Sequence, residues 1–157
     1  MQRRTLIATV LLALASTQRA LAHHGWSSFD QTKPIWLEGK AAKVSWGNPH
    51  AEIELEVSAD LRLPVDLSSR ALPAQSAAVD GAALLKNAQV PRRKDRRWEI
   101  ELAPLTRLEA WKVPQIKPGD SLAVIGFTLT GETGAAVLRA EYLFVGGQVY
   151  GLRSSPM

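Results

Sequence analysis

The sequence predicts a small all-β protein, a five- to six-stranded barrel of the OB type that carries one short helix. Apolar and polar residues alternate along several short segments, as they do in half-buried strands, and turn residues separate these segments. A helical pattern lies between the third and fourth segments, which is typical of the OB fold. A two-sheet sandwich is the alternative, and the helix position disfavours it. The 157 residues are enough for one domain.

Residues 1–22 have the pattern of a cleaved export signal. Arg3 and Arg4 precede an apolar run of 12 residues at 5–16, and Ala20-Leu21-Ala22 places small residues where a signal peptidase cuts. A membrane-spanning helix needs roughly 20 residues, so the run is too short to be an anchor. We therefore expect a periplasmic or secreted chain of residues 23–157, with no transmembrane segment.

Cleavage would leave the chain almost neutral. The formal net charge of +4 comes from 19 basic and 15 acidic residues, and the signal holds three arginines and no acid. The mature chain would keep 16 basic residues against 15 acidic ones, a net charge of +1. Nucleic-acid-binding domains carry a basic excess, so we expect no nucleic-acid partner. The lack of cysteine excludes a disulfide framework, an iron–sulfur centre and a thiol nucleophile.

The first two predicted strands form a hairpin. Residues 35–46 alternate until the pattern slips beside a central glycine, which indicates a bulge or sharp bend. After a Gly-Asn-Pro turn, residues 50–58 alternate most clearly, with His50 and three glutamates on the outer face. Lys40 and Lys43 are placed to pair with that acidic row across the hairpin.

Residues 61–95 interrupt the strand pattern. The segment is rich in Ala, Ser, Pro and Arg, lacks aromatic residues and is helical only at 81–86, so we expect a long flexible insertion. It ends in a basic cluster formed by Arg92, Arg93, Lys94, Arg96 and Arg97. The cluster is either a solvated loop end, which we favour, or a contact for an acidic lipid surface or partner.

The remaining predicted elements complete the barrel. Apolar residues at 98, 100 and 102 alternate with charged ones, so Glu99 and Glu101 are expected to be surface acids, and Trp98 and Trp111 to be core. Pro104 suits the first turn of the short helix. The last elements are, in order, a turn at 117–120, a buried strand at 122–129, a turn at 131–134, a strand at 136–144 and a Gly-Gly hairpin into a short strand at 148–152.

The mature chain holds three histidines, His23, His24 and His50, and their positions predict a metal site. Cleavage after Ala22 would make His23 the terminal residue, whose free amine and ring together chelate one metal ion. His50 would supply a third nitrogen, and such tetragonal nitrogen ligation suits Cu(II) best. His24 is an alternative ligand, because a second-position imidazole also chelates copper with the amine. Zinc could instead bind the imidazoles with water or Glu52.

The same residues have simpler interpretations. The two terminal histidines could be a disordered polar start, and His50 could be a turn residue bonded to a carbonyl or to Glu52. A metal-free module is the second functional possibility, because Trp26 and Trp46 flank the histidine motifs and could stack on a small ligand, a glycan or an envelope protein. No nucleophile elbow, phosphate loop or zinc-protease helix is present, so a binding protein is favoured over an enzyme.

Four motifs occur together: His23-His24, Phe29-Asp30, Trp46-Gly47-Asn48-Pro49-His50 and Lys117-Pro118-Gly119-Asp120. The set resembles an uncharacterised family of short exported bacterial proteins, a domain of unknown function. The resemblance covers most of the mature chain except residues 61–95, and it implies an exported location and this fold without a reaction. We therefore expect an exported copper-binding domain that acts in metal delivery, storage or sensing.

Overall fold

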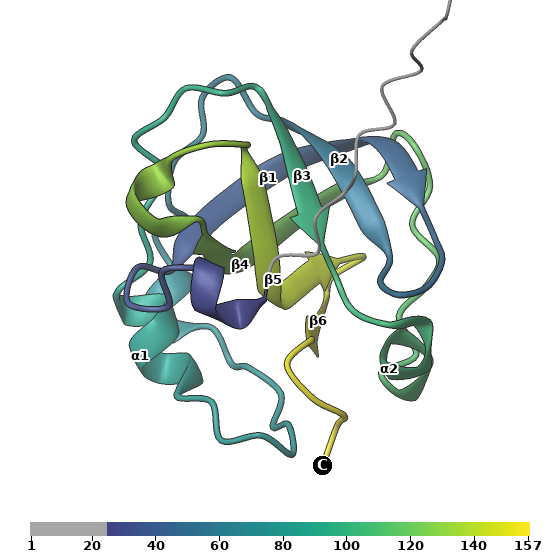
Figure 1. Cartoon of the computed structure of the whole chain (residues 1–157). Coiled ribbons are helices and arrows are strands. Elements are labelled where there is room, and N and C mark those ends of the chain that lie inside the picture. The colour runs from purple at the N-terminus through teal and green to yellow at the C-terminus, as the bar shows by residue number, and fades with distance from the viewer. Residues whose placement is uncertain (1–24) are drawn as a thin grey trace, which may run out of the picture.

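Five strands close into a barrel in the computed structural model, which describes residues 25–157 (Figure 1). The elements in chain order are η1 (Trp26–Ser28), β1 (Ile35–Ser45), β2 (Glu52–Val57), η2 (Leu67–Ser69), α1 (Gly81–Lys86), β3 (Arg97–Glu101), α2 (Leu105–Ala110), β4 (Ser121–Thr128), η3 (Thr130–Glu132), β5 (Val137–Val145) and β6 (Gln148–Gly151). The strand order β3-β2-β1-β4-β5 is closed by a parallel pairing of β3 with β5, and β6 adds a sixth strand beside β5. This closure, with α2 between β3 and β4, confirms the predicted OB-type barrel.

β1 pairs with β4 through residues 35–40 and with β2 through residues 39–45, so Gly39 lies where the two pairings overlap. A Cβ atom at Gly39 would overlap the backbone carbonyl of Glu56, so only glycine lets these strands approach so closely. The register shifts between Ala41 and Lys43, which confirms the predicted irregularity. The Lys43 ammonium lies 3.3 Å from Glu54 Oε2, one of the cross-strand ion pairs that the hairpin pattern predicted.

Two hydrophobic cores stabilise the fold. The first fills the barrel and includes Leu37, Leu55 and Trp98, which are buried as the alternation predicted. The second lies outside the barrel, where Trp36 and the outer sides of β4 and β5 pack against residues 61–95. Burial of one large apolar side chain contributes about 1.5–3 kcal/mol, so the second core fastens the insertion to the barrel.

Residues 61–95 cross this outer core on their way from β2 to β3, with α1 below the barrel in Figure 1. α1 has the bounds that the sequence predicted, and Asp80 caps it by accepting a hydrogen bond from the Ala83 N–H at 2.9 Å. Leu84 and Leu85 of α1 are buried. The flexibility expected of this segment stays a prediction.

The predicted export signal lies outside the described residues, together with His23 and His24. Within residues 25–157, no helix has the length and apolar character needed to cross a membrane.

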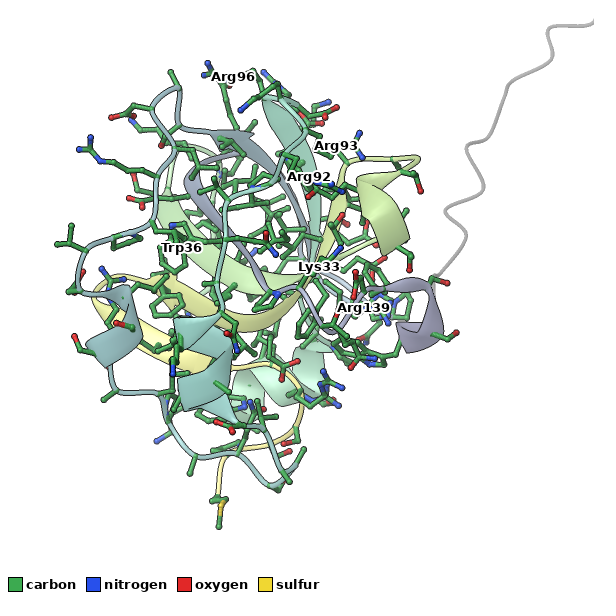
Figure 2. The ribbon with its side chains drawn as sticks, turned by 90° about the vertical axis from the view of Figure 1, so that its left-hand side faces the viewer. Lys33, Trp36, Arg92, Arg93, Arg96 and Arg139 are labelled. Carbon is green, nitrogen blue, oxygen red and sulfur yellow. The ribbon has the colours of Figure 1, made fainter. Side chains whose placement is uncertain are left out.

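The basic cluster is partly tied to the barrel. Figure 2 shows Arg92, Arg93 and Arg96 near the loop that leads into β3. The backbone N–H groups of Arg92 and Arg93 donate to the Glu132 carboxylate at 2.9 and 3.1 Å. The Arg93 guanidinium also donates to three backbone carbonyls of the β4–β5 loop. These contacts give part of the cluster a structural role within the chain.

Candidate functional site

His50 is half-buried at the end of the β1–β2 turn, two residues before the start of β2 at Glu52. The next residue is joined to the segment that follows β3, because the Ala51 N–H donates to the Ala103 carbonyl at 3.0 Å. The turn is also tied to the start of α2, where Asn48 Oδ1 accepts a hydrogen bond from the Leu105 N–H at 3.4 Å. The backbone around His50 is therefore fixed at one end of the barrel.

Glu52 begins a row of polar side chains that crosses three strands. Glu52 is the register partner of Glu101 on β3, and Glu101 is the register partner of Arg139 on β5. The row lies outside the barrel, since Ala51 and Ile53, the neighbours of Glu52 along the chain, belong to the barrel core. Adjacent strands are about 4.8 Å apart, so the backbones of Glu52 and Arg139 are separated by about 10 Å.

Glu101 and Arg139 form a buried ion pair, with exposed fractions of 4% and 9%. Nε and Nη2 of Arg139 both donate to Glu101 Oε2, at 2.7 and 2.5 Å. The expectation that Glu101 is a surface acid is therefore wrong. The alternation identifies the outer face of β3 correctly, but the N-terminal segment packs against this part of the face and removes the pair from water.

Trp26 of η1 is the residue that packs there. The Cζ atoms of Arg139 and Arg153 lie 4.9 and 3.7 Å from its ring centroid, so two guanidinium groups contact one indole. Phe29 and Phe127 meet the same ring edge-on, with centroids 6.3 and 6.4 Å away. Figure 1 shows η1 beside β5, and Figure 2 shows Arg139 next to η1. The described chain thus starts on the outer surface of β5.

Arg153 is fixed in turn by a buried carboxylate. Its Nε and Nη2 donate to Glu141 Oε2 at 2.9 and 2.6 Å, and Glu141 is fully buried. Burial raises the pKa of Glu141 above its ordinary value, while Arg153 acts in the opposite direction. Sequence reasoning missed this arrangement. The available signal was a pair of charged residues, Arg139 and Glu141, two positions apart in an otherwise apolar strand.

The outer face of β2 is acidic beyond Glu52. Arg97 of β3 forms ion pairs with Glu54 and Glu56, and Lys43 of β1 also pairs with Glu54. Hydrogen bonds from Arg97 and Lys43 hold the pKa of Glu54 below its ordinary value.

The tryptophans contact other parts of the chain. Trp46, four residues before His50, is half-buried and packs against the barrel core. Trp26 instead contacts Arg139 and Arg153. Trp111 is half-buried and its Nε1 donates to the Ser154 carbonyl at 2.8 Å.

His50 is the only histidine among residues 25–157. No group of three His, Cys, Asp or Glu side chains in that part of the chain is arranged to hold a metal. The site predicted from His23, His24, His50 and Glu52 therefore has two of its histidines outside the described residues.

A cleft of about 840 Å³ lies between the central part of β1 and the β5–β6 hairpin. Lys40, Arg70 and Phe144 are among the residues that line it. Its size is that of a small-molecule site. The cleft does not include His50, Trp26 or Trp46.

Fold and site together define a small OB-type barrel with a histidine at the tip of its first hairpin and an N-terminal turn held on its outer face. Residues 10–62, which are 53 of the 157, match the model of a family of unknown function, DUF6152. The matched range includes His23, His24, His50 and Glu52, and it ends at the start of the insertion. No curated protein and no solved structure matches the chain.

Proposed function

We propose that this protein is an exported copper-binding domain of the periplasm or cell exterior, which acts in metal delivery, storage or sensing. After cleavage at Ala22, the amine and imidazole of His23 bind one Cu(II) ion together with the imidazole of His50. His24 is the alternative ligand, and Glu52 supplies a nearby carboxylate. Nitrogen ligands in such a tetragonal set are those that Cu(II) prefers, and zinc is the less favoured ion.

The position of Trp26 is the observation that carries this proposal. Its ring lies over Arg139, which is two strand spacings, or about 10 Å, from Glu52. His50 precedes Glu52 by two residues, and therefore lies about 7 Å further along the same side of the sheet. The three residue steps from Trp26 back to His23 reach about 10 Å when extended. If residues 23–25 extend toward β2, His23 reaches His50 without any rearrangement of the barrel.

The local charge supports a cation at this position. Glu52 and Glu101 are adjacent on β2 and β3, and Glu101 is matched by Arg139. Glu54 and Glu56 of the same acidic face are matched by Arg97 and Lys43, further along the strands. Glu52 is the first residue of β2 and the carboxylate of this strand nearest to His50 in sequence, so its negative charge would favour a cation bound there.

A Cu(II) titration tests the proposal. Protein exported by its own signal is purified, its terminus is fixed by intact mass, and binding is followed by calorimetry for wild type, His50→Ala and the surface control Glu56→Gln. We expect one tight equivalent in wild type and the control, and at least about a hundredfold weaker binding in His50→Ala, since one of three nitrogens is lost. A chain that starts elsewhere than His23, or unchanged binding in His50→Ala, would refute the copper site.

Copper affinity should also depend on pH. The terminal amine must lose its proton to bind, and its ordinary pKa is about 7.7–8.0. We expect the apparent affinity to fall as the pH is lowered through that range. Affinity that stays level there would indicate a site without the amine.

A metal-free binding module is the second candidate, and the cleft of about 840 Å³ is the observation in its favour. Such a module would bind a small ligand, a glycan or an envelope protein with equal affinity in wild type and His50→Ala. The copper titration therefore separates the two functions.

A further inference from the structure

A second cavity, of about 400 Å³, is lined in part by Arg153, and Trp26 is not among its lining residues. Four parts of the chain form it: the loop before β1, the part of the insertion that contains α1, the outer sides of β4 and β5, and the segment after β6 that carries Arg153. Gln31, Asp80 and Asn87 are exposed and line its mouth, while Leu84, Phe127 and Glu141 are buried and line its floor.

Glu141 gives this cavity a specific chemistry. The side chain is 0% exposed, and Oε2 accepts both hydrogen bonds from Arg153. Oε1 is buried and accepts no hydrogen bond from residues 25–157. A buried carboxylate oxygen without a donor is costly, and such atoms in native proteins are normally satisfied by water or a ligand.

The rest of the lining favours a cation with a hydrocarbon part. The lining includes two carboxyl groups, those of Glu141 and Asp80, and one guanidinium, that of Arg153, so acidic groups outnumber basic ones. Ala77, Ala83 and Phe127 supply apolar surface around the carboxylate. Apolar walls with a few polar groups are typical of small-molecule sites of this size.

We propose that this cavity binds a small aliphatic amine. Its ammonium group donates a hydrogen bond to Glu141 Oε1, and its hydrocarbon chain packs on the alanines and Phe127. The proposal does not depend on the proposed copper site, whose ligands, His23, His24, His50 and Glu52, are not among the residues that line this cavity.

A titration followed by ¹H–¹⁵N NMR tests the proposal on the mature chain without metal. The probe is n-butylammonium chloride, and 1-butanol and NaCl serve as controls for shape and for ionic strength. We expect saturable shifts of the Ala83 and Asn87 amide signals with n-butylammonium, and at least about tenfold weaker binding of 1-butanol, because a charge-assisted hydrogen bond is replaced by a neutral one.

Two variants locate the binding. Ala78 is exposed and lines the cavity, so Ala78→Phe fills the space and should weaken amine binding at least about tenfold. Ala71 is an exposed residue of the same insertion that does not line the cavity. Ala71→Phe is therefore the control and should leave amine binding unchanged. Glu141→Gln should weaken binding to a similar degree. The absence of saturable shifts in wild type, equal binding of butanol, or full binding in Ala78→Phe with an intact spectrum would each overturn the assignment.

Discussion

Arg139 is held by Glu101 and covered by Trp26, so a single guanidinium serves both an ion pair and an aromatic contact. The side chains of Glu101 and Arg139 are both almost entirely shielded from water. A buried pair contributes little net stability when complete, but it is costly when one partner is removed. Arg139 thereby links β3, β5 and η1.

Substitution of Arg139 should show this asymmetry. Arg139→Met leaves Glu101 buried without its cation, and we expect the free energy of unfolding to fall by about 3–5 kcal/mol. The double variant Arg139→Met/Glu101→Met should regain most of that loss, since no uncompensated charge remains. Urea denaturation of the three proteins measures both values, and equal losses in the single and double variants would contradict the ion-pair account.

Trp26 should affect copper binding without being a ligand. Trp26→Leu removes the ring between Arg139 and Arg153, and we expect a loss of about 1–2 kcal/mol of stability. It should also weaken Cu(II) binding at least about tenfold if the proposed copper site is correct, because Trp26 no longer packs on Arg139 and so no longer fixes the start of the described chain on the outer face of the sheet. Trp111→Leu, at another half-buried tryptophan far along the chain, is the control. Equal copper affinity in Trp26→Leu and wild type would show that the contact of Trp26 with the two arginines has no role in copper binding.

Contacts between neighbouring elements determine how the charged face of β1, β2 and β3 titrates and how the insertion is held. Arg97 reaches Glu54 and Glu56 from the neighbouring strand, while Leu84 and Leu85 fasten a six-residue helix that would not be stable alone. Tertiary contacts therefore lower the pKa of Glu54 and stabilise α1.

Arg97→Ala should shift the titration of Glu54. Arg97 is the main cause of the lowered pKa of this carboxyl, and Lys43 is the second. We expect the pKa of Glu54 to rise toward its ordinary value in the variant, as measured by NMR titration of the side-chain carboxyl carbon. Lys94→Ala, an exposed member of the same basic cluster, should leave it unchanged. An unchanged Glu54 titration in Arg97→Ala would contradict the pairing.

Leu85→Ala tests how firmly the insertion is attached. Leu85 is 3% exposed in the outer core, so we expect a loss of about 2–4 kcal/mol in the free energy of unfolding. Ala82→Ser, at an exposed position of the same helix, should cost less than about 0.5 kcal/mol. A loss below about 0.5 kcal/mol for Leu85→Ala would mean that α1 is not held on the barrel in solution.

At the scale of the whole molecule, the sequence pattern predicts the strands well and their environment only in part. Residues 50–58 alternate because one side of β2 faces the barrel core, and this local cause is visible in the chain itself. Glu101 is covered by Arg139 of β5 and by Trp26 of η1, which are both far from it in sequence. Periodicity within one strand cannot indicate such long-range contacts on its outer face. The pattern alone therefore places Glu101 on the surface, and it does not predict the contact between Trp26 and Arg139.

The pH dependence of stability should reveal the buried Glu141. Its pKa is raised by burial, so the folded chain holds this proton more tightly than the unfolded chain, where a glutamate titrates near about 4.3. The contribution of this bound proton to the free energy of unfolding is fully present below the pKa of the unfolded chain. It is lost as the pH rises through the raised pKa of Glu141 in the folded chain.

Glu141→Gln lacks this contribution. We therefore expect the difference in unfolding free energy, wild type minus variant, to decrease as the pH rises from about 4.3, as measured by urea denaturation across a pH series. Glu109→Gln, at an exposed position, should show no such trend. A difference that grows with pH would mean that Arg153 outweighs burial.

Paramagnetic broadening tests whether the N-terminus and His50 bind one copper ion together on the outer face of β2 and β3, as proposed. One equivalent of Cu(II) is added to the naturally processed chain and ¹H–¹⁵N spectra are recorded. We expect loss of signals from residues around Trp26, His50, Glu52 and Glu101, with the amides of α1 retained. Broadening confined to the first residues, with the signals of His50 and Glu52 intact, would contradict it.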